Sequence, residues 1–155
     1  MKLLYSILAL ILIAAAFSAC KKNTMSKIPE ISLIAFGPDS MSLALDTAYL
    51  VFHLQDGDAD LGNDPTSTNY DIYIKDYRFD SGYVGYFFPT IDGSVENPNK
   101  GIQGTCTFLF PPGLIAYRQD SVHIKRDTTH FELYIVDRAG NQSNHIITPN
   151  IILTQ

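Results

Sequence analysis

Apolar residues recur at every second position through much of the chain after residue 29, where no segment shows a convincing 3.6-residue apolar repeat. The alternation is clearest in three runs: Leu50, Phe52 and Leu54; Val122 and Ile124; and Phe131, Leu133 and Ile135. Successive side chains of a β-strand point to opposite faces, so a period of two marks a strand with one buried face. The chain is therefore expected to fold into β-strands and not into helices.

Turn-forming residues separate these runs, as at 37–40, 80–82, 92–93, 111–113 and 139–141. Short strands with regular turns and no helices indicate a two-sheet antiparallel sandwich. We predict a single all-β domain over 30–155 with about seven or eight strands. The expected strands lie near 30–36, 47–55, 69–78, 83–88, within 105–125, 130–137 and 145–153, and 89–104 is expected to be a long loop.

The first 20 residues have a different character, because 17 of them are hydrophobic. Lys2 precedes an apolar run from Leu3 to Phe17, which is typical of a secretory signal. The run has about 15 residues, whereas a membrane-spanning helix needs roughly 20. An uncleaved membrane anchor is the alternative interpretation.

Phe17-Ser18-Ala19-Cys20 resembles the lipobox of bacterial lipoproteins, and the polar segment after Cys20 resembles the start of many lipoproteins of the Bacteroidota. The resemblance implies a signal peptide over 1–19, lipid attachment at Cys20 and a flexible tether over 20–29. It places the protein at the outer membrane, with a palmitate-type anchor. Lysines follow Cys20 instead of an acidic export signal, which favours the periplasmic face over the cell surface.

Cys106 would then have no disulfide partner, because the chain has two cysteines. It shares a predicted strand face with Phe108 and Phe110, which indicates a buried, unreactive thiol and not a nucleophile.

Residues 134–144, Tyr-Ile-Val-Asp-Arg-Ala-Gly-Asn-Gln-Ser-Asn, resemble the last hairpin of bacterial immunoglobulin-like and fibronectin type III-like domains. The resemblance implies an immunoglobulin-like sandwich. It says nothing about activity, because such domains carry many functions.

The segment 56–64 carries aspartates at alternate positions directly after a predicted strand. Asp56, Asp58 and Asp60, with Asp64 as a further oxygen donor, match the spacing of looped Ca²⁺ sites, and Gly62 offers a carbonyl. The loop is not an EF-hand, because Leu61 and Ser67 stand where that motif has glycine and glutamate.

Topology adds two residues to this candidate site. In an immunoglobulin-like sandwich the B–C and F–G loops emerge at the same end, so Asp137 and Asn141 are expected beside the acidic loop. We predict a structural Ca²⁺ ion with no catalytic role. The alternative is a solvated acidic turn whose aspartates cap local backbone amides.

The segment 70–88 is rich in aromatic residues. Tyr70, Ile72 and Ile74 are expected to face inward, which leaves a strip on the opposite strand face, formed by Tyr73, Lys75, Tyr77 and Phe79. Such a strip can stack on a sugar ring or dock a partner protein. Tyrosine is also a common strand former on half-exposed faces, and this is the plainer interpretation.

No catalytic motif accompanies these features. The four histidines lack zinc-ligand spacing, and no Gly-x-Ser-x-Gly or phosphate-binding loop is present, so a hydrolase is only a remote alternative. An excess of 16 acidic over 11 basic residues disfavours nucleic acid. We expect a lipid-anchored, non-enzymatic binding or structural module that contacts the membrane and an envelope protein or glycan. The alternative is a carbohydrate-binding accessory lipoprotein of an outer-membrane uptake complex. The oligomeric state is left open.

Overall fold

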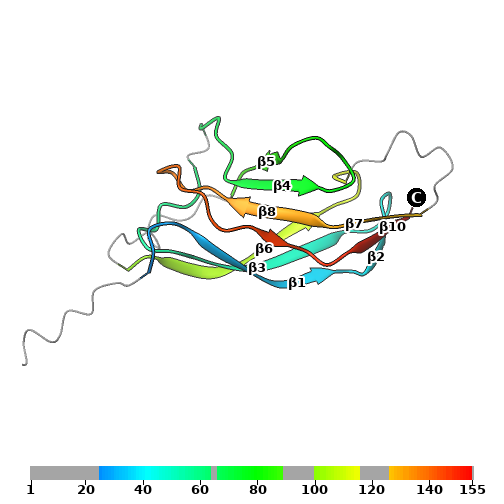
Figure 1. The fold of residues 1–155 in the computed structure, drawn as a ribbon, viewed down its shortest axis with the longest axis horizontal. Helices are drawn as coiled ribbons and strands as arrows, with labels where there is room; N and C mark the ends of the chain where they lie inside the picture. The colour runs from blue at the N-terminus through cyan, green and yellow to red at the C-terminus, as the bar shows by residue number, and fades with distance from the viewer. Residues whose placement is uncertain (1–24, 64–65, 89–99, 116–125, 155) are drawn as a thin grey trace, which may run out of the picture.

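The structure is a computed structural model, and it describes residues 25–63, 66–88, 100–115 and 126–154. Within these ranges the chain is all-β and contains no helix (Figure 1). The strands are β1 (Glu30–Gly37), β2 (Ser40–Ser42), β3 (Ala48–Asp56), β4 (Ile72–Asp76), β5 (Val84–Tyr86), β6 (Ile102–Phe110), β7 (Arg126–Thr129), β8 (Phe131–Ile135), β9 (Ile146–Ile147) and β10 (Ile151–Thr154). The predicted all-β class is confirmed.

The strands form two layers. One is the antiparallel sheet β1-β3-β6, which Figure 1 shows beside the sheet β5-β4-β8-β9. A third group, β2-β10-β7, continues the second layer, because β7 and β8 are separated only by His130 and the Thr148 amide donates to the Phe131 carbonyl at 2.9 Å. The pair β2 and β10 is parallel, and the other strand pairs are antiparallel.

The fold is a β-sandwich, and its strand order can be compared with the predicted immunoglobulin-like order. The orders β1-β3-β6 and β5-β4-β8-β9 match the orders A-B-E and C′-C-F-G of that prediction. Two details differ from the sequence prediction. The strand β6 begins at Ile102, inside the predicted loop 89–104, and the F and G strands are each interrupted, so more and shorter strands result. The predicted strand around Val122 and Ile124 lies outside the described residues.

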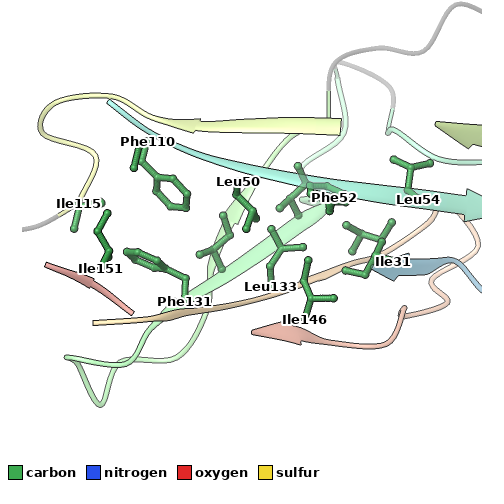
Figure 2. Close-up of a cluster of buried hydrophobic side chains, with 14 of the residues drawn as sticks. Ile31, Leu50, Phe52, Leu54, Phe110, Ile115, Phe131, Leu133, Ile146 and Ile151 are labelled. Atoms are coloured by element: carbon green, nitrogen blue, oxygen red, sulfur yellow. The ribbon is translucent and has the colours of Figure 1, made fainter. Parts of the chain in front are cut away.

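The core lies between the two layers and contains the inward residues of the alternating runs. Figure 2 shows Leu50 and Phe52 of one sheet facing Leu133 and Ile146 of the other. Leu50, Phe52 and Leu133 are fully buried. Fully burying each such side chain stabilises the fold by about 1.5–3 kcal/mol. A slip of one residue would turn these side chains to the solvent face, so their burial fixes the register of the strands.

Contacts of the domain begin before its predicted boundary at residue 30. The Gly57 amide donates to the Ser26 carbonyl at 2.6 Å, and Pro29 is buried. Cys20 and the leader lie outside the described residues. Among the residues that are described, no segment forms a helix with the length and apolarity needed to cross a bilayer.

Candidate functional site

The acidic loop follows β3 directly and turns sharply. Ala59 has a left-handed φ of 58°, and Gly62 has a φ of 79°. The loop is fastened to the turn that follows β8, because the amides of Arg138 and Ala139 donate to the Asp60 carbonyl at 3.0 Å and to Asp60 Oδ2 at 3.1 Å. The acidic loop and the turn after β8 thus meet at one end of the sandwich, as the sandwich topology predicted.

Four carboxylates converge at this junction, and we term Asp56, Asp58, Asp60 and Asp137 the acidic cluster. One carboxylate oxygen from each lies within 4.8 Å of the others. Asp56 is fully buried and Asp137 is 2% exposed. The Oδ1 atoms of Asp56, Asp58 and Asp60 are buried and accept no hydrogen bond. The structure therefore gathers four carboxylates at one point, where Asp56 and Asp137 are buried and Asp58 and Asp60 are partly exposed.

This environment changes the proton affinity of the cluster. Burial, with repulsion from Asp58, Asp60 and Asp137, raises the pKa of Asp56 to about 6, although the Asp60 amide opposes the shift. Burial and the nearby Asp137 carboxylate also raise the pKa of Asp60. Both shifts have the direction expected for carboxylates that are buried near other carboxylates, and for Asp60 the positive charge of Arg138 opposes the shift.

The other predicted ligands have different positions. Asn141 holds Asp137 in place, since its amide and its Nδ2 donate to the two Asp137 carboxylate oxygens at 2.7 and 2.8 Å. It therefore lies beside the acidic cluster, as predicted, and orients Asp137. Gly62 contributes the left-handed turn, and Asp64 lies outside the described residues.

Asp71 is a buried carboxylate that sequence reasoning missed. Its Oδ1 accepts the backbone and side-chain N–H groups of Asn63, and its Oδ2 accepts the Phe88 amide at 2.9 Å. Asp71 thereby joins the end of the acidic loop to the start of β4. Both of its oxygens have donors, in contrast to the buried Oδ1 of Asp56.

The second candidate site is the outer surface of sheet β5-β4-β8-β9. We term this set the aromatic face: Tyr73, Tyr77, Tyr83, Glu132, Tyr134 and His145. Tyr73 and Tyr134 are cross-strand partners whose rings stack at 4.9 Å, and His145 stacks on Tyr134 at 4.8 Å. The rings stand in a row across the sheet, with Tyr83 edge-on to Tyr134.

Glu132 lies at the centre of this face and is held by donors. The Tyr77 hydroxyl donates to its Oε2 at 2.7 Å, and His145 Nδ1 donates to its Oε1 at 2.6 Å. These hydrogen bonds lower the pKa of Glu132. Burial, with the carboxylate of Glu132 nearby, raises the pKa of Tyr83 to about 12. The charged form of Glu132 is therefore stabilised by the fold.

Two predictions for the aromatic segment were wrong. Tyr70 does not face inward: it precedes β4, is 42% exposed and contacts Phe87. Phe79 does not share the strip with Tyr73 and Tyr77. The Tyr77 amide still donates to the His130 carbonyl at 3.3 Å, but the Phe79 amide donates to the Asp76 carbonyl at 3.2 Å, so the chain turns and the alternation ends. Phe79 instead lines an apolar cavity of about 240 Å³. Tyr73, Lys75 and Tyr77 do lie on one face, with Lys75 over the Tyr77 ring.

Cys106 is a free, partly buried thiol packed against the core. Burial raises its pKa to about 11, which agrees with an unreactive side chain.

A scan of protein-family models and searches of curated proteins and of solved structures found no match to the chain.

Proposed function

We propose that the chain is a lipid-anchored, non-enzymatic module of the bacterial cell envelope that binds a partner protein through the aromatic face. The anchor is proposed at Cys20, on the periplasmic side of the outer membrane, from the lipobox-like residues 17–20 and the lysines that follow. The observation that carries the binding proposal is the ring and hydroxyl network around Glu132 on an outer sheet surface.

The way the rings pack favours a protein partner. Tyr73 and Tyr134 are parallel to within 8°, so each covers a ring face of the other. Tyr77 is stacked on His130 at 4.3 Å and lies under the Lys75 ammonium. The face thus presents ring edges, hydroxyls and one carboxylate. Tyrosine is enriched in protein interfaces because it combines apolar area with a hydrogen-bonding group.

Carbohydrate binding is the second candidate, and a different pair of rings favours it. Tyr70 and Phe87 meet at a tilted angle of 46°, and they are 42% and 52% exposed. A tilted contact leaves part of each ring face open for a sugar ring. In that case the protein would act as a carbohydrate-binding accessory of an uptake complex.

Site-specific photo-crosslinking tests the binding surface. A photo-reactive amino acid at Ile147 reports on the aromatic face, because Ile147 pairs with Glu132 and is 55% exposed. The matched control is Leu109 on the other sheet, which is also 55% exposed. We expect a discrete crosslinked band from position 147 that is lost in Glu132→Ala. Equal crosslinking from both positions would contradict the proposal.

Two further assays test the carbohydrate alternative and the lipid anchor. Binding on a glycan array that is lost in Tyr70→Ala and Phe87→Ala would establish the carbohydrate alternative instead. For the anchor, labelled palmitate should be incorporated by wild type and by Cys106→Ser but not by Cys20→Ala. Label that persists in Cys20→Ala would refute the lipid attachment.

A further inference from the structure

Three segments that are distant in sequence meet at the acidic end of the sandwich. They are the loop after β3, the turn after β8, and residues 25–27 that precede β1. Lys27 Nζ lies 3.6 Å from Asp58 Oδ2, and the Ser26 carbonyl accepts the Gly57 amide. A Cβ at Gly57 would come within 2.5 Å of the Ser26 carbonyl, so the segments are in direct backbone contact.

The acidic cluster at this point is incomplete as a hydrogen-bonded network. Asp56 is fully buried, and its Oδ2 accepts the Asp60 amide while its Oδ1 accepts nothing. Buried carboxylate oxygens normally have donors, because an unpaired charged oxygen out of water carries a large desolvation penalty. Asp71 in the same region follows this rule, with donors to both of its oxygens. The acidic cluster does not follow this rule, because the buried Oδ1 atoms of Asp56, Asp58 and Asp60 all lack a donor.

We propose that Asp56, Asp58, Asp60 and Asp137 bind one Ca²⁺ ion. Ca²⁺ takes six to eight hard oxygen ligands at roughly 2.3–2.6 Å, so ligands on opposite sides of the ion lie about 4.6–5.2 Å apart. The four carboxylate oxygens fall within that span. Mg²⁺ usually retains several waters and uses one or two carboxylates, and Zn²⁺ prefers nitrogen and sulfur ligands. The donor set therefore fits Ca²⁺ best, with water filling the remaining positions.

The ion has a structural consequence that reaches beyond the loop. Asp60 belongs to the loop after β3 and Asp137 to the turn after β8, so an ion bound by both crosslinks the two segments. Hydrogen bonds from Ala139 to Asp60 and from Asn141 to Asp137 already hold these ligands in place. Gly57 lies between two of the ligands and carries the contact with Ser26. Bound Ca²⁺ thus also fixes the junction between the sandwich and the segment that leads to it. This inference is independent of the proposed function, because no residue of the aromatic face takes part.

Calorimetric titration of Ca²⁺ into the metal-free full-length protein tests the site. We expect one ion per chain with a Kd of about 10⁻⁴ to 10⁻³ M, as in extracytoplasmic modules. At 10 mM Ca²⁺ the Tm should rise by roughly 5–10 °C over the value in chelator. Asp58→Asn should weaken binding at least about tenfold, since it removes one charged ligand from a weak site. The matched control Asp80→Asn, an exposed aspartate in the turn between β4 and β5, should bind as wild type does.

Three outcomes would overturn the proposal. They are absence of heat and of a Tm shift in wild type, tighter binding of Mg²⁺ than of Ca²⁺, and equal loss in Asp58→Asn and Asp80→Asn. Hydrogen exchange at the Gly57 amide tests the junction separately. Exchange should slow when Ca²⁺ is added to wild type and should not respond in Asp58→Asn. Unchanged exchange in a protein that does bind Ca²⁺ would overturn the junction part.

Discussion

The acidic cluster and the aromatic face both contain carboxylates, but the groups around these carboxylates differ. Glu132 is surrounded by donors from Tyr77 and His145, and its pKa is lowered. Asp56 is surrounded by other carboxylates, and its pKa is raised to about 6. Donors within the aromatic face satisfy Glu132, whereas the Oδ1 atoms of Asp56, Asp58 and Asp60 in the acidic cluster accept no hydrogen bond. On this difference we base the two proposals, that the aromatic face binds a partner and that the acidic cluster binds an ion.

Loss of Asp71 should have the largest effect on stability. Asp71→Ala leaves the Phe88 amide and two donors of Asn63 without their acceptor, which should cost about 3 kcal/mol of unfolding free energy. Urea unfolding measures the loss. Because Asp71 already has donors and is not a member of the cluster, the loss should be the same in Ca²⁺ and in chelator. A loss that changes with Ca²⁺ would show that Asp71 belongs to the ion site.

The effect of Asp56→Asn on the unfolding free energy should have opposite signs with and without Ca²⁺. In saturating Ca²⁺ it removes a charged ligand and should lower the unfolding free energy by about 2 kcal/mol. In chelator it removes a negative charge that Asp58 and Asp60 repel and supplies an N–H donor near them, so it should raise stability. Urea unfolding under both conditions tests this. Destabilisation of equal size in both would mean that no ion acts at Asp56.

Gly57→Ala should be destabilising by about 1–2 kcal/mol, because the added Cβ meets the backbone carbonyls of Met25 and Ser26 at 2.5 Å. The matched control is Gly82→Ala, where a Cβ meets nothing within 4 Å. Thermal melting of the two variants compares them. Equal Tm values for both would contradict the contact between the loop and residues 25–27.

The smallest effect concerns pH and the aromatic face. A carboxyl whose folded pKa is lowered contributes stability above its unfolded pKa of about 4.5 and loses it as the pH falls through the folded value. Glu132→Gln should therefore flatten the loss of stability between pH 5 and pH 3. Tyr77→Phe, which removes one donor, should flatten it in part. Urea unfolding at several pH values gives the profiles, and unchanged profiles would show that these bonds contribute nothing.

Alternation of apolar residues was enough to predict the main strands, because burying one sheet face sets the register of β3 and β8. Three residues, Ser40–Ser42, are too few to show a period, so β2 and its parallel pairing with β10 were not foreseen. Phe79 was misplaced because a strand pattern cannot show where the strand stops, and β4 ends at Asp76.

The acidic cluster was predictable in part, since spacing indicated Asp56, Asp58 and Asp60, and topology brought in Asp137. Sequence could not show that Asn141 donates two hydrogen bonds to Asp137, because an amide can bind an ion or orient a carboxylate. It also could not reveal Asp71, whose role depends on a donor 17 residues away in Phe88. The role of Glu132 was missed for the same reason, because its donors Tyr77 and His145 lie next to the strands that pair with β8 and are distant from Glu132 in sequence.

Crystals grown with Ca²⁺ would test the central claim most directly, through the anomalous signal of the ion. We predict one anomalous peak about 2.3–2.6 Å from carboxylate oxygens of Asp56, Asp58, Asp60 and Asp137. An anomalous map without a peak at this position, with the Asp56 Oδ1 atom hydrogen-bonded to a water or a protein donor, would contradict it.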